Sequence, residues 1–247
     1  MLTVGCGGDD EASTTTDTSI VGATSTAAEP TGTTTSRPTT SAGVSTTTGT
    51  LASTLPGEPI FSFPEEGDVL AVMAVAHDDV LNVRAVPGAD AEVVAELGPT
   101  AANAVSTGRA RKLSQSIWNE VTVGEVTGWA NSSYLGFMGA TDDATAEFLN
   151  GANPPETETM EAMGELVADG FTPEDPEPGL RIVQSMDVSQ GDLAEVAFDV
   201  IGVADDAVAG YRLHIFATPN DNSGGFVLRS IERTLFCWRA VSDGFCV

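Results

Sequence analysis

From residue 68 onward, short runs of apolar residues alternate with turn residues. In residues 68–137 this pattern predicts five short strands, at 69–75, 80–85, 92–97, 117–123 and 126–130. Pro87 followed by Gly88 suits the centre of a type II turn, and Gly124 followed by Glu125 suits a two-residue hairpin. Several short strands in so short a segment predict a small barrel or sandwich.

Residues 142–247 carry a different pattern, in which helical periodicity precedes longer strands. A helix is expected after Asn153 and should end near Gly170, with Met160, Met163 and Val167 on its apolar face. A second, short helix is expected at 142–150. Strand patterns follow at 180–187, 193–201, 208–217 and 226–236. One or two helices leading into an antiparallel sheet predict an α+β domain.

The residues before this folded part have no apolar periodicity. Thr, Ser, Ala and Gly dominate residues 7–60, which include three runs of three threonines. Such a segment buries too little apolar surface to offset the entropy lost on ordering, so it is expected to be a disordered linker. Its density of Thr and Ser also resembles an O-glycosylated stalk.

Charge narrows the choice of partners. The chain has 36 Asp and Glu against 10 Lys and Arg, for a formal net charge of −26. Phosphate backbones and anionic membrane surfaces are repelled by such a protein, so we expect no nucleic-acid partner and no membrane contact through a basic patch. No run of 18 apolar residues occurs, so no membrane-spanning helix is expected.

Cys6 stands apart from the other two cysteines, after Gly5 and before a polar run. This arrangement resembles the cleavage site of bacterial lipoproteins, in which the cysteine carries the lipid. It departs from that pattern because Thr3 stands where leucine is usual, and because the residues before Cys6 are too few for a signal peptide. The resemblance implies that residues 1–6 are the remnant of a lipoprotein signal and that the chain is held at the membrane by a lipid on Cys6. A free thiol is the alternative.

Cys237 and Cys246 flank a turn formed by Asp243 and Gly244. We expect a disulfide between them, which places the protein in an oxidising compartment. A zinc site is the alternative, but His77 and His214 are the only histidines and neither has ligand spacing. No metal and no cofactor are therefore expected.

Several motifs in residues 68–137 occur in the order found in one family. They are Leu81-Asn82-Val83-Arg84, Pro87-Gly88, Trp118 with Val121, Thr127-Gly128-Trp129 and Tyr134-Leu135. This segment resembles the bacterial SH3-type (SH3b) domain, except that residues 99–116 form a longer and more irregular connection. The resemblance implies a small SH3-like β-barrel that binds cell-wall peptidoglycan or a peptide, with Arg84, Trp118, Trp129 and Tyr134 as candidate contacts. Alternatively, Trp129 fills the barrel core and Arg84 braces a loop.

The expected fold is thus mostly β. A disordered Thr-rich linker at 7–60 precedes an SH3-like barrel at 68–137 and an α+β domain with a C-terminal disulfide loop at 142–247. No Ser-His-Asp or Cys-His arrangement is evident, and His214 lies mid-strand. We expect a non-enzymatic lipoprotein at the outer face of the membrane that binds peptidoglycan or a peptide. The alternatives are an envelope hydrolase with a carboxylate site in the C-terminal domain and a protein-binding scaffold.

Overall fold

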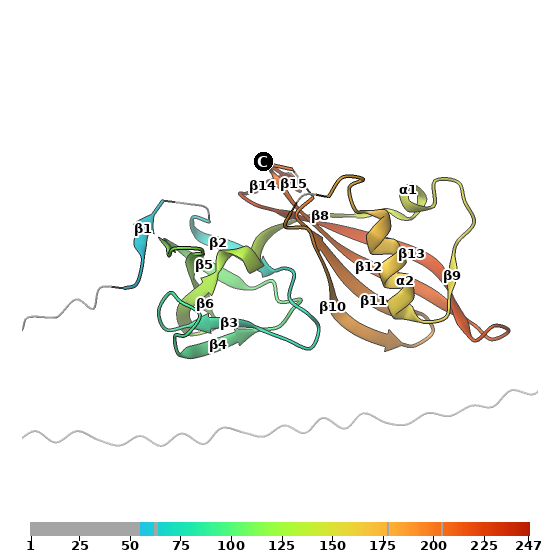
Figure 1. Ribbon diagram of the computed structural model, residues 1–247, viewed down its shortest axis with the longest axis horizontal. Helices are drawn as coiled ribbons and strands as arrows, with labels where there is room; N and C mark the ends of the chain where they lie inside the picture. Colours follow the sequence, from blue (N-terminus) through green and yellow to red (C-terminus); the bar gives the residue numbers. More distant parts are fainter. Residues whose placement is uncertain (1–54, 62–63, 177, 204) are drawn as a thin grey trace, which may run out of the picture. The chain divides into compact units, whose positions relative to one another are not determined.

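The computed structural model describes residues 55–61, 64–176, 178–203 and 205–247 (Figure 1). Cys6 and residues 7–54 of the expected linker lie outside these residues, whereas residues 58–60, at the end of that expected linker, form a strand paired with residues 110–112. The described residues belong to one compact unit, and their fold is mostly β, as predicted. Within the described ranges, no helix is long and apolar enough to cross a bilayer.

The strands of the first half are short. They are β1 (Glu58–Ile60), β2 (Glu66–Val72), β3 (Leu81–Arg84), β4 (Val93–Leu97), β5 (Ala104–Lys112), β6 (Ile117–Val123) and β7 (Val126–Asn131). A 3-10 helix, η1 (Ser132–Tyr134), follows β7 directly. β5 lies in the segment expected to be irregular, and it pairs with β1, β2 and β6.

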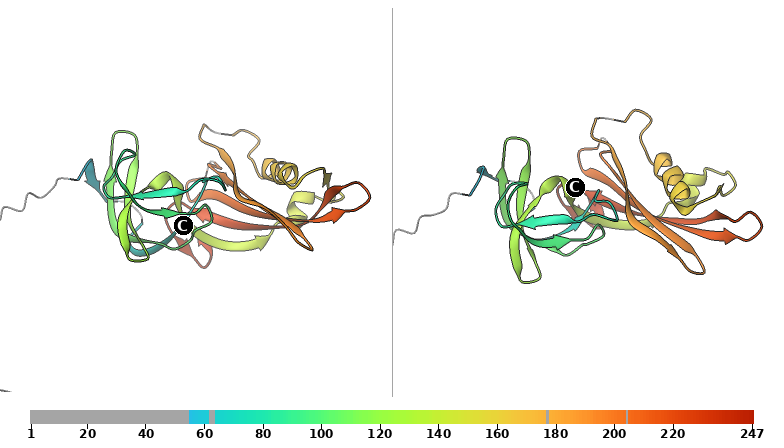
Figure 2. Two further views of the ribbon diagram at one scale, coloured as in Figure 1. Left: turned by 90° about the horizontal axis from the view of Figure 1, so that it is seen from below. Right: turned by 60° about the horizontal axis from the view of Figure 1, so that its bottom comes forward.

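The second half has longer strands and two helices. It contains β8 (Leu135–Asp143), α1 (Thr145–Leu149), β9 (Glu156–Thr157), α2 (Met160–Gly170), β10 (Arg181–Gln190), β11 (Ala194–Ile201), β12 (Val208–Asn220) and β13 (Gly225–Cys237). The short hairpin β14 (Val241–Ser242) and β15 (Phe245–Cys246) ends the chain. Figure 2 shows both helices on one side of the long strands.

The strands of the two halves form one antiparallel path rather than a separate barrel and sheet. Its order is β10-β11-β12-β13-β8-β2-β5-β6-β7-β3-β4. Among the described strands, β4 and β10 are its two unjoined ends, so the expected closed barrel is wrong. The reason lies in β8, which pairs with β2 at one end and continues to Asp143 to pair with β13. The sheet therefore opens into the second half instead of closing on itself.

Helix α2 begins later than the sequence predicted. Thr159 caps it, since its hydroxyl accepts a hydrogen bond from the Ala162 amide at 3.2 Å. The expected cap, Asn153, lies too early because β9 pairs with β13 before the helix can start. The apolar face is nevertheless buried as predicted: Met160, Met163 and Val167 pack on the face of β11 that carries Phe198.

Both faces of β11 are buried, which the alternating pattern did not predict. Ala194, Val196, Phe198 and Val200 face α2. On the opposite face, Ala197, Asp199 and Ile201 are also buried, and Ile201 packs with Met73 and Phe236. Residues just after β2 thus cover the second face of β11, which joins the two halves through a shared core.

The predicted disulfide is confirmed. Cys237 and Cys246 are bonded, with their Cα atoms 5.2 Å apart. The Cys237 side chain is fully buried with the core cluster of the first half. The bridge therefore fastens the C-terminal hairpin to the region where β8 and β13 meet.

Candidate functional site

Three of the four predicted ligand contacts line one hollow. Arg84 from β3, Trp118 from β6 and Tyr134 from η1 border a space of about 510 Å³, which we call the β3 hollow. Asp79 and Asn131 also border it. A volume of this size lies in the range of small-ligand sites.

Strand alternation places these side chains on one face. Trp118 is paired with Asn131 across β6 and β7, and paired residues point to the same side of a sheet. η1 then turns the chain, and Asn131 caps it by accepting a hydrogen bond from the Ser133 amide at 3.0 Å. The cap fixes the turn that brings Tyr134 to the hollow.

Arg84 braces its own loop and still carries an unbalanced charge. Its guanidinium donates to the Ala91 carbonyl at 2.5 Å, across the turn between β3 and β4. In the part of the chain that the structure describes, no carboxylate lies within ion-pair distance of it. A guanidinium has five N–H donors, so one contact leaves others for a ligand carboxylate.

The two aromatic residues of the hollow differ in exposure. Trp118 is only 4% exposed, and its indole N–H donates to the Ser116 hydroxyl at 2.9 Å. It therefore forms a fixed wall. Tyr134 is half-buried, and the Arg181 guanidinium lies 5.2 Å from the centre of its ring.

Trp129 is set apart from the hollow. It is 2% exposed and lies under the Arg109 guanidinium, 5.5 Å from the ring centre. Arg109 in turn pairs with Glu120 at 2.7 Å. Trp129 is paired with Glu120 across β6 and β7, so it lies on the face opposite Val121, which belongs to the core. Its surroundings leave little of the ring for a ligand.

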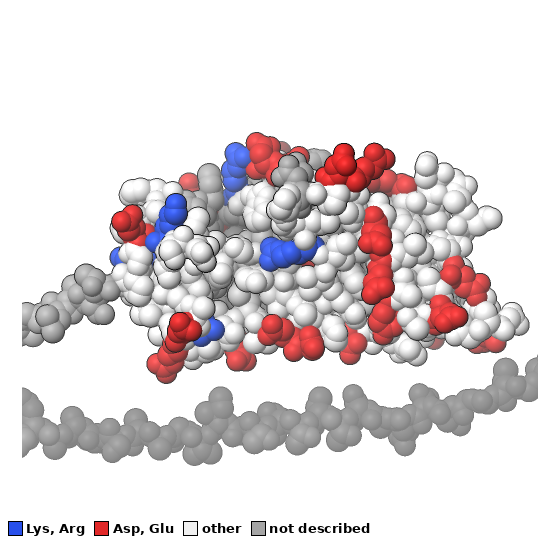
Figure 3. Space-filling model, in the orientation of Figure 1, with Lys and Arg blue, Asp and Glu red and all other residues white. Residues whose placement is uncertain are grey.

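Arg111, another basic residue of the first half, contacts the chain itself. Arg111 donates to the carbonyls of Leu55 and Gly57, at 2.7 and 2.8 Å. Figure 3 shows acidic side chains spread over the face in view and the few basic ones set apart from each other. A positive charge in a hollow is therefore uncommon on this acidic surface.

Two adjacent carboxylates of the turn before β12 are engaged in the fold. Asp205 accepts hydrogen bonds from the amides of Val208 and Ala207, and these bonds lower its pKa. Asp206 pairs with Arg239 at 3.1 Å. Over the described residues, no group of three or more His, Cys, Asp or Glu side chains could hold a metal ion.

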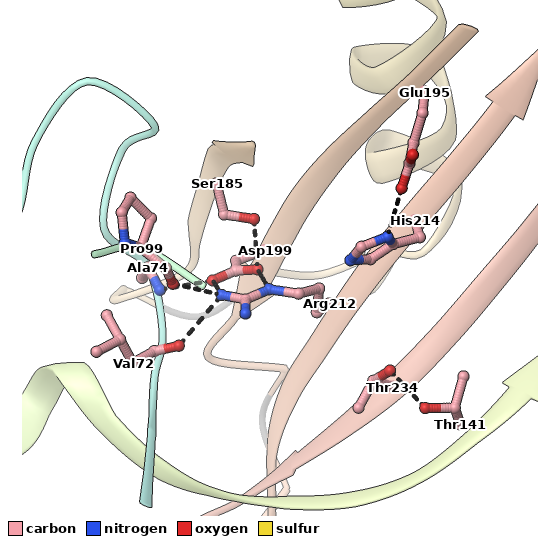
Figure 4. Close-up of polar contacts among 10 residues, drawn as sticks. All are labelled: Val72, Ala74, Pro99, Thr141, Ser185, Glu195, Asp199, Arg212, His214 and Thr234. Carbon is pink, nitrogen blue, oxygen red and sulfur yellow. Dashed lines mark hydrogen bonds and ion pairs between the residues drawn. The ribbon is translucent and has the colours of Figure 1, made fainter. Parts of the chain in front are cut away.

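A buried ion pair was missed by the sequence reasoning. Asp199 of β11 and Arg212 of β12 bond at 2.8 Å, with side chains 0% and 4% exposed (Figure 4). The same carboxylate accepts from the Ala74 amide, and Arg212 donates to the Val72 and Pro99 carbonyls. The only sign of this pair in the sequence is an acidic and a basic residue in two successive strands. Such residues are usually exposed to solvent, so the sign did not indicate a buried pair.

His214 lies nearby, with its Nδ1 atom 3.0 Å from the Glu195 carboxylate. Both side chains of this pair are about one-third exposed, at 31% and 30%. Figure 4 shows the pair apart from the buried Asp199–Arg212 cluster. No serine or cysteine hydrogen-bonds to this histidine among the residues described.

Comparison of the chain with protein-family models, with curated proteins and with solved structures gives no match. The resemblance to the bacterial SH3-type family thus stays a prediction that rests on the motif residues.

Proposed function

We propose that this protein is a non-enzymatic binding protein of the cell envelope and that the β3 hollow takes a carboxylate-bearing peptide of the cell wall. The observation that carries the proposal is Arg84. It is a cation without a carboxylate partner in the described chain, and it borders a hollow of about 510 Å³ beside Trp118 and Tyr134. An arginine fork binds a carboxylate, and aromatic walls hold the apolar part of a peptide or the face of a sugar.

The envelope location rests on two independent features. The Cys237–Cys246 disulfide favours an oxidising compartment. The lipoprotein-like setting of Cys6 and the Thr-rich linker after it favour a lipid-anchored protein held away from the membrane surface. Mass spectrometry of the native protein should find a cysteine-linked lipid, and an unmodified Cys6 would contradict the anchor.

We further propose that residues 68–137 are related to the bacterial SH3-type family. The motif residues that carry the resemblance lie mainly in β3, β6 and β7, with Tyr134 in η1, and five of them border the hollow. The relation does not need a closed barrel, because the open path still places β3 beside β7 and β7 beside β6.

The test is co-sedimentation of the full chain with purified cell-wall peptidoglycan. Arg84→Gln should weaken binding by about tenfold or more, the usual worth of a hydrogen bond to a charged group. Arg111→Gln is the matched control, because Arg111 is also half-buried and contacts only backbone carbonyls. Its binding should equal that of the unchanged protein.

Three results would overturn the proposal. Equal binding by Arg84→Gln would remove the hollow from the function. Release of soluble wall fragments would favour the hydrolase alternative. Absence of wall binding together with capture of one specific protein would favour a scaffold.

A further inference from the structure

A second cleft lies on the other side of β6 and η1. It has a volume of about 550 Å³, and we call it the Arg181 cleft. Segments far apart in the sequence form it, among them β6 with η1, the start of β8, the start of β10, and Trp238 next to the disulfide. Because side chains alternate along a strand, Trp118 borders the β3 hollow while Ile117 and Asn119 border this cleft.

Asn119 lines the cleft and has a side-chain oxygen without a hydrogen-bond partner among the described residues. The residue is 3% exposed, and its Oδ1 atom is the one buried side-chain oxygen or nitrogen without a partner in the described part of the chain. Buried polar groups are nearly always hydrogen-bonded, because an unpaired one is costly. A donor from outside the chain would satisfy this oxygen.

Arg181 supplies a positive charge to the same cleft. Its Nη2 donates to the Ser133 carbonyl at 2.8 Å, and its guanidinium lies over the Tyr134 ring at 5.2 Å. These two contacts hold the guanidinium in place. No carboxylate among the described residues pairs with it, so its remaining donors suit an anion with a planar pair of oxygens.

The rest of the cleft is apolar. Leu135 and Phe137 are buried and line it, and Trp238, which is 39% exposed, lines it beside them. The Trp238 amide donates to the Ala207 carbonyl at 3.0 Å, and the neighbouring disulfide limits its backbone. The aromatic ring is thus presented on a fixed support.

We propose that the Arg181 cleft binds the carboxyl-terminal residue of a peptide. The free carboxylate meets Arg181, an amide N–H of the peptide donates to Asn119 Oδ1, and an aliphatic side chain packs with Leu135 and Trp238. A fatty acid has the carboxylate and the apolar chain but no N–H donor. A sugar acid has donors but no apolar body for the floor. This site is separate from the β3 hollow and does not depend on its function.

The test uses the isotope-labelled full chain and two probes. One is an acetylated glycyl-glycyl-valine peptide with a free carboxylate, and the other is the same peptide with a C-terminal amide. We expect the first to shift the NMR signals of the Trp238 indole and the Asn119 side-chain amide in a saturable manner. The second should bind at least about tenfold more weakly, because the charged contact is lost.

Substitutions test the charged and the polar contact one at a time. Arg181→Gln should weaken binding by about tenfold or more, whereas Arg229→Gln, at an exposed arginine of β13, should leave it unchanged. Asn119→Leu should fold with a denaturation midpoint at or above that of the unchanged protein, yet bind the peptide more weakly. Unchanged stability together with weaker binding would distinguish a residue that accepts a hydrogen bond from the ligand from a residue that only supports the fold.

Three outcomes would overturn the inference, and a fourth would support it. Equal shifts by the amide-capped peptide would remove Arg181 as a carboxylate partner. Absence of saturable shifts in the cleft would mean that an ordered water alone meets Asn119. Shifts at Trp118 rather than at Trp238 would assign the peptide to the β3 hollow, so this inference would fail while the proposed function stands. Loss of wall binding in Arg84→Gln with intact Trp238 shifts would support two separate sites.

Discussion

Replacement of Asp199 by asparagine should destabilise the protein more than any other change from a carboxylate to an amide on β11. The Asp199 carboxylate is fully buried and accepts four hydrogen bonds (Figure 4). Two come from Arg212 at 2.8 Å each, one from the Ser185 hydroxyl at 2.9 Å and one from the Ala74 amide at 2.8 Å. Asp199→Asn keeps the shape but removes the charge and turns one acceptor into a donor that faces other donors.

The size of the loss in unfolding free energy follows from the Arg212 charge, which stays buried after the substitution. Arg212 stays 3% exposed and keeps its carbonyl contacts to Val72 and Pro99, but its charge has lost its partner. Breaking a buried ion pair from one side costs about 3–5 kcal/mol. Domains of this size are stable by about 5–15 kcal/mol, so the loss is a large share of the total.

Urea denaturation measures this cost. Tryptophan fluorescence reports the transition, since the chain has three tryptophans, one in β6, one in β7 and one next to Cys237 inside the loop that the disulfide closes. Glu195→Gln is the matched control, because it makes the same chemical change on the same strand and breaks a pair that is about one-third exposed. It should cost no more than about 1 kcal/mol. The double variant Asp199→Leu with Arg212→Met should recover much of the loss, because neither charge is then left alone.

The reasoning would be refuted if Asp199→Asn and Glu195→Gln had the same free energy of unfolding. It would also fail if far-ultraviolet circular dichroism, which reports the strands of both halves, and tryptophan fluorescence gave separate transitions in the unchanged protein. The pair contacts residues just after β2 as well as β11 and β12. A single transition is therefore expected for the two halves.

Other predictions concern the disulfide, the helix and a tyrosine. Cys246→Ser should lower the free energy of unfolding by about 2–3 kcal/mol in urea denaturation, from the entropy of a loop with a sequence separation of 9. Gly164→Ala should destabilise by about 1–3 kcal/mol, although alanine favours helices, because its Cβ would overlap the Phe198 ring. Burial raises the pKa of Tyr211 above its ordinary 10.0, so in Tyr134→Phe the remaining phenol should ionise late in an ultraviolet titration. Its stabilising contribution is full below pH 10.0 and is lost as the pH rises through the raised pKa.

The first two of these predictions have their own controls, and each of the three has an outcome that would contradict it. Treatment of the unchanged protein with a reductant should reproduce the loss seen in Cys246→Ser, and an unchanged midpoint would contradict the loop argument. Glu165→Ala, at an exposed position of α2, should stay within about 0.5 kcal/mol, and an equal effect of Gly164→Ala would remove the steric argument. A Tyr211 phenol that ionises at its ordinary pKa would show that the ring is solvated.

The sequence predicted the elements better than their assembly. Alternation and turn residues located β3, β4, β6 and β7 within a few residues, since those signals are local. β5 was missed because its residues, such as Thr107, Gly108 and Arg109, lack a clear apolar alternation. The expected barrel was wrong for a different reason. Only the partner of β8, which lies almost a hundred residues later in β13, shows that the sheet continues.

The buried polar residues could not be predicted for the same reason as the sheet order: both depend on contacts between residues that are far apart in the sequence. Asp199 lies on the face of β11 opposite the obvious apolar one, and that face counts as solvent-exposed until residues near Met73 cover it. Arg84, Trp118 and Tyr134 were singled out as candidates because aromatic and basic residues stand out in a motif. Asn119 and Arg181 carry no such signal, because they become candidate ligand contacts only when the fold brings β6 and β10 to the border of one cleft. Strand alternation nevertheless places Trp118 and Asn119 on opposite faces of β6. A sequence analysis that considers both faces of this strand would therefore assign Asn119 to a different surface from Trp118.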